Sequence, residues 1–182
     1  MPWSGASSLS SRKFTCGHCG SIVASSTGWP QQGGTGFIYL CTHCDAPTYF
    51  NRSNSPLPGV PFGEPVAHLP ADVEALYNEA RRCTSAAAYT ASLLLSRKLL
   101  MNVGVAQGAD PGKPFIFYVE YLAANGYVPP NGKGWLDHIR KKGNEATHEI
   151  ALMNERDAQE LLAFLEMLLK FIYEFPNKIP LP

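Results

Sequence analysis

Cys16-Gly-His-Cys19 is followed, after 21 residues, by Cys41-Thr-His-Cys44. Each CxxC pair can present two thiolates from one tight turn, and two such turns complete the tetrahedral set of four sulfurs that zinc prefers. A redox CxxC motif would need no matched second pair. The spacing therefore predicts one structural Zn²⁺ per chain with all four cysteines as ligands, which leaves no open position for catalysis.

The residues around these pairs predict a small β module over residues 1–52. Gly20 favours the turn after the first pair. About 50 residues bury too little apolar surface for an independent core, so the metal would take its place. We expect His18 and His43, inside the two turns, to be exposed because four thiolates already close the site. The arrangement resembles a zinc ribbon, with strand-like runs at 21–24, 37–40 and 48–50.

A module of this kind can bind nucleic acid, bind protein or only support a neighbouring domain. Aromatic and basic side chains in it form a candidate surface for base stacking and phosphate binding, made of Trp3, Arg12, Lys13, Phe14 and Trp29. The alternative is that these aromatic side chains only cover the metal module. The sequence leaves both open.

Composition limits the partners of the chain. Its 182 residues include 15 Lys and Arg and 15 Asp and Glu, so the net charge is zero and no overall basic field attracts nucleic acid. A local basic patch stays open. No apolar run is typical of a signal peptide or a membrane span, so we expect a cytoplasmic chain without membrane contact. In that reducing compartment, metal binding is favoured over disulfides.

The rest of the chain predicts a linker and a helical domain. Residues 53–70 contain five prolines, which indicates an extended linker or a strap packed on a neighbour. Residues 71–176 have helical periodicity, with Asp72 and Asn154 as expected N-caps, Pro176 as a helix end and Cys83 as a buried thiol. We therefore predict a mostly α chain, in which a small N-terminal β zinc ribbon precedes a bundle of four to five helices. The first begins at Asp72, and the others lie at about 86–106, 114–124, 135–153 and 155–174.

Polar residues gather on one face of the fourth predicted helix. At about 100° per residue, Asn144 and His148 lie together, flanked by Arg140 and opposite the apolar stripe. A histidine beside an amide and a cation can perform acid–base chemistry on a phosphodiester, although solvated helix faces carry the same residue types. Arg97 lies among leucines of the second helix, where its charge needs a partner or a route to water. If Arg97 reaches this face, the four residues form a site.

Several stretches of the helical region resemble the HEPN-like domain-of-unknown-function family 4145. These are Asn78–Cys83, Ala87–Ala91, Leu94–Leu100, His138–His148 and Asp157–Leu162, with Arg97 and the Gly-Asn-x-x-x-His run ending at His148 as the most specific parts. The resemblance implies an all-α HEPN-like bundle that forms homodimers, and a zinc ribbon ahead of such a domain fits the family.

The resemblance also implies a candidate activity. Many relatives in the wider HEPN superfamily are metal-independent ribonucleases of defence and toxin systems, with a motif of arginine, a polar residue and histidine. Asn144 and His148 match its second and third members. Gly143 occupies the arginine position, so Arg140 or Arg97 would replace that arginine.

Two functions therefore stay open, and the sequence does not decide whether the chain is an enzyme. In the first, the chain is an RNA endonuclease of HEPN type, or an RNA-binding component, of a bacterial defence or toxin system. In the second, it is a non-catalytic module that dimerises and binds a partner, with the ribbon docking nucleic acid or protein. A zinc-binding regulator of transcription ranks last, because no helix-turn-helix pattern with a basic recognition helix is present.

Overall fold

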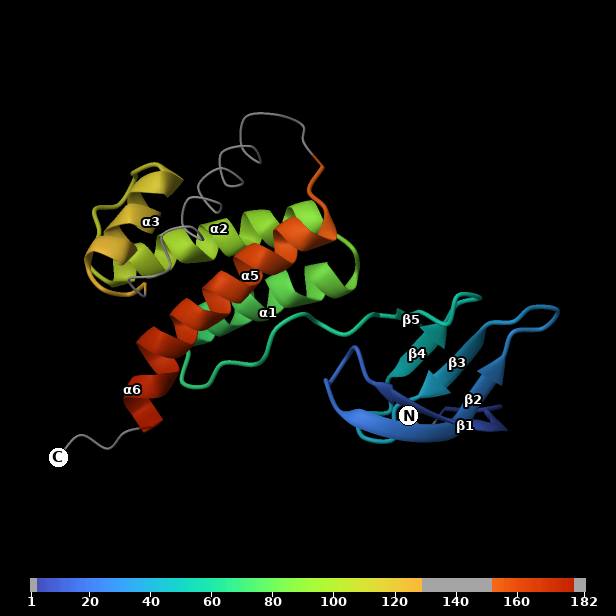
Figure 1. The fold of residues 1–182 in the computed structure, drawn as a ribbon. Helices are drawn as coiled ribbons and strands as arrows, with labels where there is room; N and C mark the ends of the chain where they lie inside the picture. The colour runs from blue at the N-terminus through green and yellow to red at the C-terminus, as the bar shows by residue number, and fades with distance from the viewer. Residues whose placement is uncertain (1–2, 129–151, 179–182) are drawn as a thin grey trace. The chain divides into compact units, whose positions relative to one another are not determined.

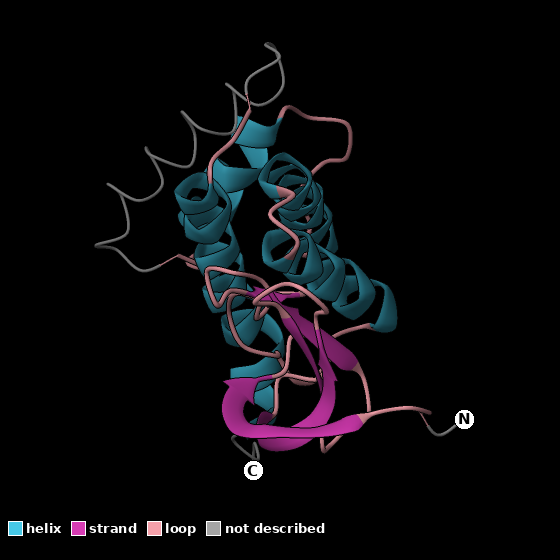
Figure 2. Cartoon of the chain, turned by 90° about the vertical axis from the view of Figure 1, so that its right-hand side faces the viewer, coloured by secondary structure: helices cyan, strands magenta, loops and turns pink. Residues whose placement is uncertain are grey.

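The computed structural model describes residues 3–128 and 152–178. The chain divides into two compact units, Met1–Pro61 and Phe62–Pro182. The first unit is a β-sheet and the second is a set of helices, as Figure 1 shows by element and Figure 2 by colour. We describe each unit by itself.

The first unit is one antiparallel sheet of five strands in sequential order. The strands at 37–40 and near 48–50 match the sequence pattern, whereas the first strand was not predicted. Four of its nine residues are serine, five of the nine are exposed, and its pairing with the second strand shifts between Ser8 and Arg12. The strands are β1 (Ser7–Thr15), β2 (Ile22–Pro30), β3 (Phe37–Leu40), β4 (Pro47–Phe50) and β5 (Pro56–Leu57).

A small aromatic cluster fills the sheet unit. Phe14 and Phe50 meet edge to face with ring centroids 5.3 Å apart, and Tyr39 meets Phe50 in the same way at 5.8 Å. Two cysteines, Cys16 and Cys41, are fully buried in this cluster. The core is therefore continuous with the region where the cysteines meet, and its few apolar residues explain why the unit needs further cross-linking.

The second unit is built around α2. This helix contacts α1, α3 and α5. Gly104 of α2 permits a close approach to α3, because a Cβ there would lie 2.8 Å from the Tyr118 ring. The predicted fourth helix, 135–153, falls almost wholly outside the described residues. The described helices are α1 (Ala71–Ser85), α2 (Tyr89–Ala106), α3 (Phe115–Ala124), α5 (Glu155–Leu169), the π-helical turn η2 (Lys170–Glu174) and α6 (Phe175–Lys178).

Two predicted helix ends are corrected by the structure. Asp72 is not the N-cap of α1. Pro70 occupies that position without a side-chain cap. Asp72 lies in the first turn, where its negative charge interacts favourably with the positive end of the helix dipole. Pro176 does not end the last helix, because η2 widens the turn before it and α6 carries the helical path through the proline to Lys178.

Two further predictions concern single side chains. Asn154 caps α5 as predicted: its side chain accepts from the Asp157 amide at 3.0 Å, and the Asp157 carboxylate accepts in return from the Asn154 amide at 3.4 Å. Cys83 is only half-buried, so the prediction of a buried thiol is wrong. The buried stripe of α1 runs through Tyr77, Ala80 and Thr84, which leaves Cys83 at its edge.

Residues 62–70, named the strap here, pack on the helical unit although they carry no helix or strand. From α1, Arg81 donates to the carbonyl oxygens of Phe62 at 3.0 Å and Gly63 at 2.6 Å. Tyr77 donates its hydroxyl to the Glu64 carbonyl at 2.9 Å. The carbonyl groups of the strap are therefore held by one helix.

Two carboxylates from the C-terminal part of the chain accept hydrogen bonds from the amide groups of the strap. The Glu166 carboxylate accepts from the Glu64 amide at 3.0 Å and is paired with Lys170 at 2.5 Å. Eight residues further on, the Glu174 carboxylate accepts from the Ala67 amide at 3.1 Å. The structured domain thus begins at residue 62, and the stretch predicted as a linker also contains β5.

The strap yields a prediction about Gly63, which has a φ of +73°. A Cβ at this position would lie 2.6 Å from Glu166 Oε2, whereas Gly112, with a φ of +76°, has open space around it. Both Gly63→Ala and Gly112→Ala carry the left-handed backbone cost of about 1–2 kcal/mol. We expect Gly63→Ala to lower the free energy of unfolding by about 1 kcal/mol more than its control. Equal losses in urea denaturation would contradict this account of the strap.

Candidate metal centre

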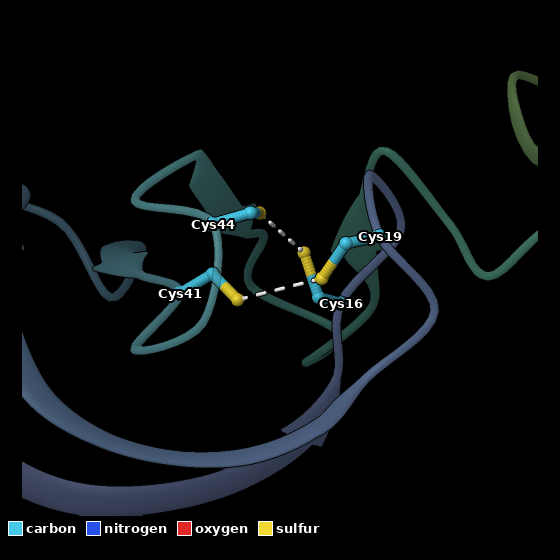
Figure 3. Close-up of side chains that lie close together, drawn as sticks. All are labelled: Cys16, Cys19, Cys41 and Cys44. Carbon is cyan, nitrogen blue, oxygen red and sulfur yellow. Dashed lines mark hydrogen bonds between the residues drawn. The ribbon is translucent and has the colours of Figure 1, made fainter.

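The four cysteines come from the turns of two neighbouring hairpins. Cys16 and Cys19 lie between β1 and β2, and Cys41 and Cys44 lie between β3 and β4. Because β2 pairs with β3, the two turns open at the same end of the sheet. Figure 3 shows the four side chains pointing toward one another.

The distances between the sulfurs fit a tetrahedral metal ion. All four Sγ atoms lie within 4.8 Å of one another. The Cys16–Cys44 and Cys19–Cys41 pairs are each 3.8 Å apart, and all four cysteines are free thiols. A disulfide would require about 2.05 Å. Four sulfurs at about 2.3 Å from a central ion form a tetrahedron with edges of about 3.8 Å. The cluster has the size of a four-thiolate metal site.

The two turns have the same backbone structure. In the first, the Cys16 amide donates to the Ser21 carbonyl at 2.9 Å; in the second, the Cys41 amide donates to the Ala46 carbonyl at 3.0 Å. Gly20 and Asp45 occupy equivalent positions and both have positive φ, +73° and +57°. Glycine adopts this conformation without strain and aspartate tolerates it better than most residues. The repeated geometry explains why two short motifs converge on one point.

Backbone and side-chain donors surround the sulfurs. The His18 amide donates to Cys16 Sγ and the His43 amide to Cys41 Sγ, both at 3.4 Å. Hydrogen bonds from Ser21 lower the pKa of Cys19 to about 5, because they stabilise its thiolate, whereas burial raises the pKa of Cys16. Ser21 was not identified from the sequence as a donor to Cys19. Its position two residues after Cys19 was the one indication of this role.

The two histidines in the turns are exposed. The His18 ring nitrogen Nε2 lies 3.0 Å from the Pro47 carbonyl oxygen, which ties the first turn to β4. The carbonyl groups of Pro58 and Gly59 also cover the first turn, since each oxygen would lie 2.4 Å from a Cβ at Gly17. Thr42 at the equivalent position of the second turn is exposed, which explains why one turn carries glycine and the other threonine.

The five residues predicted to form a nucleic-acid-binding surface are not all available at the surface of the sheet unit. Phe14 belongs to the core, so its assignment to this surface is wrong. The Arg12 guanidinium lies over the Phe50 ring at 4.4 Å and donates to Asn54. Trp3 donates its indole N–H to the Asp45 carbonyl at 2.7 Å. These contacts bind most of the five side chains into the module itself.

Among the candidate catalytic residues, Arg97 is the one that the structure describes. It lies on the buried side of α2, is 9% exposed, and its guanidinium carbon is 4.5 Å from the centre of the Phe115 ring. Burial lowers its pKa from the ordinary value, yet an arginine stays protonated in proteins. Arg140, Asn144 and His148 lie outside the described residues, so the structure does not bring the four candidates together or separate them.

These observations define a two-part protein in which a four-cysteine β module precedes a helical domain. The family model described as a domain of unknown function (DUF4145) matches residues 78–179, more than half of the chain, and the chain therefore belongs to this family. No curated protein and no solved structure matches the chain significantly. Within the described ranges, no helix has both the length and the apolar character required to cross a membrane.

The packing on the first turn generates a test with a matched control. Gly17→Ala would push a methyl group against two backbone carbonyls, and such overpacking costs about 1–3 kcal/mol. Thr42→Ala, at the equivalent exposed position of the second turn, should change the free energy of unfolding by at most about 0.5 kcal/mol. Urea denaturation followed by tryptophan fluorescence measures both. Similar values for the two variants would contradict the packing of 58–59 on this turn.

Proposed function

We propose that the four-cysteine cluster holds one structural Zn²⁺ and that the sheet unit is a zinc ribbon. The sulfur separations of 3.8 Å carry this proposal. Thiolate ligands favour zinc over hard cations such as Mg²⁺ and Ca²⁺, and a closed set of four ligands gives the ion a folding role. Free thiols suit a reducing compartment, so we place the chain in the cytoplasm.

Metal removal should affect the two units unequally. A strong chelator at neutral pH is expected to unfold the sheet unit, because few apolar residues support it without the ion. The helical unit has a larger core of its own and should keep its far-UV circular dichroism near 222 nm. Retention of the β1–β4 amide signals by NMR after complete zinc removal would contradict a structural metal.

For the helical unit, we propose an HEPN-like domain that acts on RNA. Membership of the family and the buried arginine on α2 support this proposal. His148 would remove the proton from a ribose 2′-hydroxyl, and Asn144 would orient the phosphodiester. The 2′-oxygen then bonds to phosphorus as the bond to the 5′-oxygen breaks, and the leaving 5′-oxygen takes up a proton from water, which gives a 2′,3′-cyclic phosphate and a 5′-hydroxyl. Arg140 or Arg97 would stabilise the negative charge on the phosphate.

The ribonuclease proposal predicts loss of cleavage on changing one histidine. His148→Ala should reduce cleavage of mixed single-stranded RNA by at least about 100-fold, as expected for loss of an acid–base group. His68→Asn is the control, since His68 is exposed with a φ of +61° that asparagine tolerates. The expected products carry 5′-hydroxyl ends. Background-level cleavage by the unaltered chain, or equal cleavage by both variants, would reject catalysis.

A second candidate function, a dimerising module without catalysis, is favoured by the end of the last helix. Phe171 and Phe175 are 50% and 47% exposed. A hollow of about 400 Å³ lies beside them, lined by Gln107, Tyr127, Phe171, Ile172, Phe175 and Pro176. An exposed aromatic pair next to an apolar hollow is typical of an interaction surface. The dimer expected from the family resemblance would use this end of the helix.

The dimer proposal can be tested with a single exposed side chain. Phe175→Ser should weaken self-association by at least about tenfold, because a buried aromatic contributes strongly to interfaces. Leu152→Ser is the control, since Leu152 is 89% exposed and lies before α5. Light scattering over a range of concentrations measures both variants. A monomer at every concentration, in the unaltered chain, would reject this function.

A further inference from the structure

The strap lies on the helical unit as a bound peptide would. Five hydrogen bonds from α1, α5 and η2 hold it, and each of them uses a main-chain group of the strap. Val66 is buried in the helical core, and Phe62 and Leu69 pack against that core. Main-chain hydrogen bonds combined with a few side-chain contacts are how proteins bind extended peptides. These contacts therefore depend on the segment itself and not on its connection to α1.

The strap folds back on the helix that follows it. Its first residues accept hydrogen bonds from Arg81 in the second half of α1, and Glu64 accepts one from Tyr77 in the first half. Pro70 is then the N-cap of the same helix. The strap therefore runs antiparallel to α1, and the chain reverses its direction within a few residues before Pro70.

This reversal is strained at His68. Its φ is +61°, in the left-handed region that residues other than glycine adopt only with strain. A short connection under strain favours exchange of the neighbouring segment between two copies of a chain, because the strain is released when the connection straightens. A straightened connection at His68 would carry the strap away from its own α1 and toward a second molecule.

The first residue of the strap lies beside the surface proposed above for dimerisation. Phe62 lines a hollow of about 340 Å³ together with Met167, Lys170 and Phe175. Phe175 also borders the hollow that includes Phe171. A second copy that docks at Phe175 would therefore contact the start of the strap.

We propose that two copies of this chain exchange their straps, so that residues 62–70 of each lie on α1, α5 and η2 of the other. A second copy carries the segment that fits this surface, including Gly63, where a Cβ would lie 2.6 Å from Glu166, and the buried Val66. The inference rests on the proposed self-association and names how the partner engages. Each helical unit still holds a strap after exchange, so few contacts are lost.

Photocrosslinking between isotope-labelled chains tests the exchange. A photoreactive benzoylphenylalanine replaces Phe62, because the hollow beside that side chain has room for the added ring. Full-length chains with heavy and with natural isotopes are purified with zinc, mixed at high concentration, irradiated and digested. The mass of each cross-linked pair of peptides, one with residue 62 and one from α5, shows whether it joins one chain or two. Links between heavy and natural peptides are expected.

The strained residue supplies the variants. His68→Gly removes the strain of the unexchanged form. Ala87→Gly is the matched control, because Ala87 is also exposed, has a φ of +57° and lies in the turn between α1 and α2. His68→Gly should lower the yield of mixed-isotope links at least about fivefold, whereas Ala87→Gly should not change it. His68→Val should raise the yield, since a β-branched residue disfavours positive φ.

The outcomes separate this inference from the dimer surface at Phe175. Links within single chains only, in a sample that light scattering shows to be dimeric, would overturn strap exchange and leave the dimer. Equal mixed-link yields in His68→Gly and Ala87→Gly would also overturn exchange, since the links would then arise across an unexchanged interface. Mixed links that persist in Phe175→Ser and fall in His68→Gly would support exchange and reject the Phe175 surface.

Discussion

The convergence of four sulfurs at the end of the sheet is the constraint on which the first unit depends. Two hairpins that pair through β2 and β3 also meet at this end of the sheet, where Cys16, Cys19, Cys41 and Cys44 lie together. The aromatic cluster beside them is too small to hold five strands by itself. Each turn uses the same backbone hydrogen bonds to place its sulfurs, so the sheet positions the four-cysteine cluster.

The helical unit depends on a different constraint. Its core surrounds α2, and the strap closes one side of it through main-chain hydrogen bonds to side chains of α1, α5 and η2. The family match begins at residue 78, whereas the residues held by these contacts begin at Phe62. The folded domain is therefore longer than the matched segment, and its first part is held by these polar contacts together with Val66, which belongs to the helical core.

The sequence predicted those features that arise from local patterns. The cysteine spacing predicted that the four cysteines meet, apolar periodicity predicted α2 and α3 to within a few residues, and Asn154 was correctly assigned as a cap. Strand β1 was missed because its serine-rich sequence lacks alternation. The contacts of the strap with α5 and η2 join residues about a hundred positions apart, as in Glu64 and Glu166, and no local pattern records them. For the proposed ribonuclease site, the sequence supplied four candidates, of which the structure describes Arg97.

X-ray absorption at the zinc edge on the purified chain tests the central claim most directly. The account predicts one zinc per chain with a first shell of four sulfurs at about 2.3 Å and no lighter ligand. A shell that contains nitrogen or oxygen would mean that a histidine or water replaces one of the four cysteines. That result, or a chain purified with its cysteines paired as disulfides and no zinc, would contradict the account.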